Sequence, residues 1–173
     1  MKLELNDRKL RLTTLAGIMV YIAVVLKNGG EQIGQKDHFL SSVVGRVLFI
    51  GGWALMAYSI AGNPSMKSIK KSLVAYGGAI GVVIAVMAMK MSLTPAQKKP
   101  FGLLFIGSWI SIAVSVGMGK GTDSKMLGLF ALVNVLGSML VILPKQRELK
   151  IIDGPGMGLF AITFISLAVA NSL

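Results

Sequence analysis

The stretch LFIGGWALMAYS, residues 48–59, returns twice later in the chain in altered form. The second copy is LFIGSWISIAVS at 104–115, which keeps seven of the twelve letters, and the third is LFAITFISLAVA at 159–170, which keeps six letters of the second. The copies start 56 and then 55 residues apart. Three copies at nearly equal spacing favour an internal repeat, with a period slightly longer than the roughly 20 to 50 residues usual for arrayed units.

The retained letters recur at steps of four. Residues four apart lie along one side of an α-helix. In each copy they are two aromatic residues followed by an alanine, and together they make what we call the aromatic stripe: Phe49, Trp53, Ala57, Phe105, Trp109, Ala113, Phe160, Phe164 and Ala168. Core packing is a commoner use of such a stripe than a ligand site, so we expect these residues to pack helices together.

Composition indicates that these helices lie in lipid. Of the 173 residues, 54% are hydrophobic and 14% charged, and the mean hydropathy is +0.73. Six stretches contain no charged residue: 12–26, 47–66, 72–89, 100–119, 126–144 and 154–173. At ~1.5 Å per residue the longer ones reach the ~30 Å of a hydrocarbon core. The sequence therefore predicts an all-α integral membrane protein with six transmembrane helices.

The repeat and the six runs together predict one transmembrane domain over residues 1–173. We expect three tandem helical hairpins, approximately 1–62, 63–119 and 120–173, with the aromatic stripe on the second helix of each. The alternative is a water-soluble bundle with buried central helices. Five of the six runs lack a polar face, which argues against that alternative.

The basic residues are divided evenly between the two sides that six spans would create. The net charge is +11, and nine Lys and Arg residues fall on each side. The positive-inside rule needs an imbalance, so it gives no membrane orientation here. Basic rims on both sides predict contact with anionic lipid headgroups on both faces. A second interpretation places proteins of the same assembly against one or both faces, or nucleic acid against one face.

Residues suited to catalysis are missing from the apolar runs. No Asp, Glu, Lys, Arg or His lies inside any of them, and the chain has one histidine, His38, and no cysteine. An intramembrane ionisable residue is the usual sign of ion coupling or catalysis. We therefore expect no enzyme activity, cofactor, metal or small-molecule substrate. A small-solute channel or transporter remains the alternative, because internal repeats are common among transporters.

Small and polar residues within the runs predict close helix packing. Gly77 and Gly81 form a small-xxx-small pair, which lets two helix backbones approach closely in lipid. Asn134 lies inside the fifth run, and its amide is expected to bond to a neighbouring helix.

One segment suggests a family. GRVLFIGGWALMAYSIAG, Gly45–Gly62, resembles the spans of small multi-pass membrane proteins of large icosahedral double-stranded DNA viruses, including algal viruses, whose capsids enclose a lipid membrane. The architecture is also loosely similar to bacterial six-span proteins built from two-helix repeats. The viral resemblance implies a structural role, as an inner-membrane or minor capsid protein of the virion that ties the bilayer to the shell and faces the genome. It supplies no catalytic residue.

Overall fold

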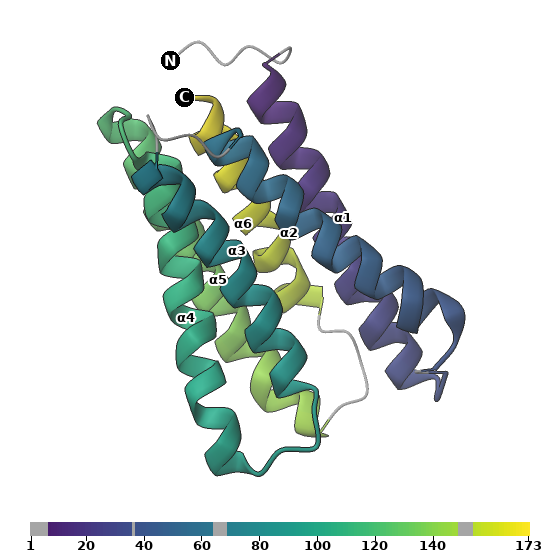
Figure 1. Ribbon diagram of the computed structural model, residues 1–173. Coiled ribbons are helices and arrows are strands. Elements are labelled where there is room, and N and C mark those ends of the chain that lie inside the picture. Colours follow the sequence, from purple (N-terminus) through teal and green to yellow (C-terminus); the bar gives the residue numbers. More distant parts are fainter. Residues whose placement is uncertain (1–6, 36, 64–68, 149–153) are drawn as a thin grey trace.

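The computed structural model describes residues 7–35, 37–63, 69–148 and 154–173, with side-chain detail except at 32, 139–148 and 154–155. The described chain is all-helical, as predicted (Figure 1). Its elements are α1 Arg8–Gln32, the π-helical turn η1 Leu40–Val44, α2 Gly45–Ala61, α3 Ile69–Met89, α4 Pro95–Gly117, α5 Thr122–Glu148 and α6 Gly154–Ser172. Each of the six predicted apolar runs overlaps one of these α-helices.

Four helices of the described chain are long and apolar enough to cross a membrane. They cover Arg8–Glu31, Leu40–Ala61, Ile69–Met89 and Pro95–Gly117, and a shorter apolar helix follows at Gly156–Ser172. This content is compatible with a multi-pass membrane protein, which is the class that composition predicts.

The helices form a ring. Each helix packs against the next one in the chain, and α6 packs against α1, which closes the ring. The most extensive contacts are those of α1 with α2, α3 with α4, and α5 with α6. Further contacts of α4 with α2 and with α6 bring the even-numbered helices together. Segments at the two ends of the chain are therefore direct neighbours.

The two ends of the bundle carry different parts of the chain (Figure 1). The start of α1, the end of α6 and the α4–α5 turn lie at one end, which we call the terminal end. The turns between α1 and α2 and between α3 and α4 lie at the opposite end.

Helix α4 starts five residues earlier than the apolar run at 100–119 predicts. Thr94 is its N-cap: the Thr94 hydroxyl accepts a bond from the Gln97 N–H at 3.3 Å, and the Gln97 side chain accepts one from the Thr94 N–H at 2.9 Å. This reciprocal capping box satisfies two otherwise unpaired donors. Pro95 occupies the first turn, where its missing N–H costs nothing, and Pro100 lies inside the helix.

Large apolar side chains cover the outside of the bundle. They occur on α1, α3, α4, α5 and α6, for example Ile18, Ile80, Leu103, Phe130 and Ile165, all of which are about half exposed or more. The buried positions hold aromatic residues and many small ones. A surface this apolar suits acyl chains rather than water.

Candidate functional site

The centre of the bundle is an aromatic triad made by equivalent positions of the three sequence copies. Trp53 of α2 and Trp109 of α4 meet edge to face with 5.1 Å between ring centroids. Phe164 of α6 lies 6.3 Å from Trp53 and 6.1 Å from Trp109, so each ring contacts the other two. All three side chains are buried. These distances are those of favourable aromatic pairs.

The other aromatic residues of the stripe extend this centre along the bundle axis. Phe49 packs edge-on to Trp53 at 6.4 Å, and Phe105 contacts Trp109 at 6.3 Å. Phe160 contacts Phe164 at 4.9 Å, and it also stacks on Tyr21 of α1 at 6.4 Å.

The alanines of the stripe, Ala57, Ala113 and Ala168, are buried as well. The backbone carbonyl of Ala113 lies close to Gly128 of α5, where a Cβ would come within 2.8 Å of that oxygen. The structure therefore brings the aromatic residues of the predicted stripe together and buries its alanines.

Close packing of α3 on α4 depends on Gly78 and Gly81. A Cβ built at Gly78 would lie 3.0 Å from the Ser108 carbonyl oxygen and 2.9 Å from Ile112, and one at Gly81 would collide with the Ser108 hydroxyl. Gly77 is exposed, and a Cβ there would meet no atom within 4 Å. The prediction is thus wrong for Gly77, because that glycine is on the outer face of α3, about 100° around the helix axis from Gly78.

Among the described residues, Asn134 does not make the predicted bond to a neighbouring helix. Its amide donates to the Phe130 carbonyl of its own helix at 2.8 Å. The polar residue that joins helices is Asn171, near the end of α6. Asn171 donates to the Thr13 hydroxyl of α1 at 2.9 Å and to the Ser59 carbonyl of α2 at 3.0 Å.

The bonds of Asn171 belong to a buried polar cluster at the terminal end. The Thr13 and Ser59 hydroxyls lie 3.0 Å apart, and Thr13 also donates to the Lys9 carbonyl at 2.8 Å. One buried acceptor of the cluster, Oδ1 of Asn171, has no partner among the described residues. A polar residue inside an apolar run is the sequence signal for such a cluster. The sequence shows this signal at both Asn171 and Asn134. Only the contacts in the structure distinguish the asparagine that joins helices from the one that does not.

Lys120, in the α4–α5 turn, caps the C-terminus of α6. Its amine donates to the carbonyls of Ala170, at 3.0 Å, and Asn171, and the Ser124 hydroxyl donates to Ala170 at 2.7 Å. Cations and donors stabilise the unpaired carbonyls at a helix C-terminus. Burial, with smaller effects from Lys9 and Lys71, lowers the pKa of Lys120 to about 8, while Asp7 opposes this shift.

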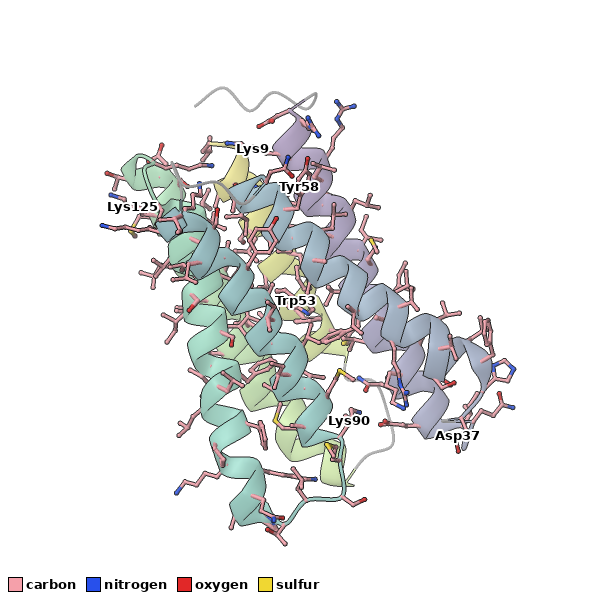
Figure 2. The ribbon with its side chains drawn as sticks, in the orientation of Figure 1. Lys9, Asp37, Trp53, Tyr58, Lys90 and Lys125 are labelled. Carbon is pink, nitrogen blue, oxygen red and sulfur yellow. The ribbon has the colours of Figure 1, made fainter. Side chains whose placement is uncertain are left out.

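The opposite end carries ion pairs. The Lys90 amine lies 2.9 Å from Oε1 of Glu31, and the Lys27 amine lies 3.8 Å from the same oxygen. The first pair joins the residue that follows α3 to the last turn of α1, and Figure 2 shows Lys90 at this end of the bundle. His38 is exposed in the adjoining turn, where its Nδ1 faces the Leu40 N–H at 3.4 Å. Groups of three or more metal-ligating side chains are not found in the described ranges.

The indole N–H groups of Trp53 and Trp109 are both buried without an acceptor within the described chain. An unpaired donor in an apolar centre carries a desolvation cost. The centre thus holds two buried hydrogen-bond donors for which the described residues supply no acceptor.

No family model, curated protein or solved structure matches the chain. The resemblance of Gly45–Gly62 to viral membrane proteins therefore stays a prediction.

Proposed function

We propose that the chain is a non-enzymatic structural protein of a membrane, which anchors the bilayer to an overlying protein assembly such as a viral capsid. The observation that carries this proposal is the aromatic triad. Trp53, Trp109 and Phe164 fill the centre, where the pathway of a channel formed by this ring of helices would run. A bundle with a filled centre suits a protein that holds its neighbours in place.

The proposal includes six membrane spans arranged as three tandem hairpins. The extensive pairing of α1 with α2, α3 with α4, and α5 with α6 supports this arrangement. So does the meeting of three equivalent sequence positions in one triad. Parts of α5 and α6 have the apolar sequence that the remaining two spans require.

The proposed partners lie at both ends of the bundle. Lys98 and Lys99 are at the start of α4, at the opposite end, and Lys70 and Lys71 are at the start of α3, at the terminal end. Basic residues near an anionic leaflet contribute ~1 kcal/mol each. The same residues suit an acidic surface of a capsid protein, and nucleic acid facing one end would use the same charges.

Location and abundance test the structural role. We expect the protein in purified, membrane-containing virus particles at a high and fixed copy number relative to the major shell protein. Chemical cross-linking of intact particles should join its lysines to shell proteins. A protein found only in cell membranes, at variable abundance and without a fixed neighbour, would contradict the proposal.

A flux assay tests the alternative of a small-solute channel or transporter. The purified protein is reconstituted in liposomes loaded with ions, sugars or amino acids, and release is compared with that from empty liposomes. A filled centre predicts no release above the empty control. Saturable flux of one solute that depends on the protein would establish transport in place of anchoring.

A further inference from the structure

Two apolar grooves lie at corresponding seams of the ring. One, with a volume of about 440 Å³, lies between α4 and α5 and is lined by Ile110, Ala113, Val114, Gly117, Lys125 and Leu129 among others. The other, of about 480 Å³, lies between α1 and α6. Each groove lies where an even-numbered helix meets the next odd-numbered helix around the ring, with α1 following α6.

Equivalent positions of the sequence copies line both grooves. Ile110, Ala113 and Val114 of α4 lie in the first groove. The residues 55 positions later, Ile165, Ala168 and Val169 of α6, lie in the second. The two grooves are therefore built by equivalent sides of α4 and α6, and each includes the stripe alanine of its helix, Ala113 or Ala168.

Of the two grooves, as the described residues line them, the α4–α5 groove alone has a charged side chain in its lining. That residue is Lys125, in the first turn of α5, and Figure 2 shows it at the terminal end. Gly117 makes room for the lysine stem, since a Cβ at Gly117 would lie 3.0 Å from Cγ of Lys125. The stem of a lysine packs well on apolar surface while its amine stays near the headgroups.

The depth of the groove matches part of one leaflet. Its α5 wall runs from Lys125 to Leu132, which is about 10 Å at ~1.5 Å per residue. Half of a hydrocarbon core is about 15 Å. With Lys125 at the headgroup level of the membrane location proposed above, the groove would end before the bilayer midplane.

We propose that the α4–α5 groove binds one acyl chain of an anionic phospholipid, whose phosphate lies at Lys125 in the leaflet at the terminal end. The inference rests on the membrane location proposed above. An apolar groove with a cation at its headgroup end has the charge complement of such a lipid. A membrane-spanning helix of a partner would be ~30 Å long, so most of it would extend beyond a groove of about 10 Å.

The surroundings of Lys125 favour an anion. Seven basic residues and two acidic ones of the described chain lie at the terminal end: Arg8, Lys9, Arg11, Lys70, Lys71, Lys120 and Lys125, with Asp7 and Asp123. An anionic headgroup at the terminal end would offset part of this excess positive charge.

Native mass spectrometry tests the proposal. The full chain is taken from vesicles of equal phosphatidylglycerol and phosphatidylcholine, and the lipids that stay bound are counted by mass. We expect one retained phosphatidylglycerol per chain, with a preference over phosphatidylcholine of about fivefold, the factor that corresponds to ~1 kcal/mol. Lys125→Gln should bring the preference close to one, and millimolar inorganic phosphate should not displace the lipid.

Groove filling provides a second variant. Val114→Trp places a large side chain in the groove from an exposed position and should abolish retention of that lipid. Leu103→Trp, also exposed on α4 but outside the lining, and Lys99→Gln, at the opposite end, should retain it.

Three results would overturn the inference. They are equal retention by wild type and Lys125→Gln, unchanged retention in Val114→Trp, and a second protein chain bound in place of lipid. None of these results would contradict the proposed membrane location. That location would fail if the protein were soluble without detergent, in which case no lipid would be retained by any variant.

Discussion

Trp53 and Trp109 stand at the same position of two sequence copies and meet edge to face at the centre of the bundle, 5.1 Å apart. Phe164, at that position of the third copy, contacts both. Each ring is therefore held by contacts to two other helices, so the triad joins α2, α4 and α6. In lipid, where no hydrophobic force drives helices together, packing of this kind supplies much of the stability.

The triad predicts a large cost for truncating either tryptophan. Trp109→Ala should lower the free energy of unfolding by about 3 kcal/mol, the lower end for buried aromatic residues, because an acyl-chain environment reduces the transfer contribution. Unfolding in mixed micelles of mild detergent and dodecyl sulfate measures the change. Leu103→Ala, at an exposed position of the same helix, should change stability by less than about 0.5 kcal/mol. Equal stability of wild type and Trp109→Ala would show that the triad does not hold the bundle together.

Trp53→Phe should cost much less than Trp53→Ala. Phenylalanine keeps the ring contacts and removes an indole N–H that has no acceptor within the described chain. We expect a loss below about 1.5 kcal/mol, as for other conservative core replacements. The same unfolding assay gives the value. A loss as large as that of the alanine variant would mean that the indole N–H has a bonding partner.

Adjacent glycines of α3 give a matched pair. Gly78→Ala should destabilise by about 1 to 3 kcal/mol, since its Cβ would press on the Ser108 backbone carbonyl, which has little freedom to move. Gly77→Ala should be neutral or stabilise by up to about 1 kcal/mol, because the site is open and alanine is the better helix former. Thermal unfolding in detergent compares the two. The reverse order would contradict the observed rotation of α3.

Two asparagines form a second pair. Asn171→Ala should lower the free energy of unfolding by about 1 to 2 kcal/mol, because it removes bonds to α1 and α2. Asn134→Ala removes a bond within its own helix and should cost less than about 0.5 kcal/mol. Measuring both in one detergent decides the matter: similar losses would show that the Asn171 bonds do not join the helices.

The shifted pKa of Lys120 predicts that the free energy of unfolding depends on pH. Its pKa is about 8 in the folded chain, below the usual 10.5, so the unfolded chain binds more protons between these values. Stability contributed by this group should therefore rise from about pH 8 to about pH 10.5 and stay constant below that window. Lys120→Gln should flatten this part of the profile. Unfolding of both proteins across pH 7 to 10 measures the difference, and identical slopes would refute it.

Much of the fold follows from the sequence alone. Runs without charge, long enough for a bilayer, specify helices because every backbone polar group in lipid must bond within its own segment. The step of four in each copy specifies which residues share a face. These are properties of single helices, and local spacing determines them.

Neighbour relations were decided only by the tertiary structure. Spacing places Gly77 and Gly81 on similar faces but does not say how α3 is rotated against α4, and the rotation selects Gly78 with Gly81. It cannot distinguish Asn134 from Asn171 either, because the partners of Asn171 are 158 and 112 residues away. Contacts of that range depend on how all the helices pack at once, since α6 reaches α1 only when the ring closes.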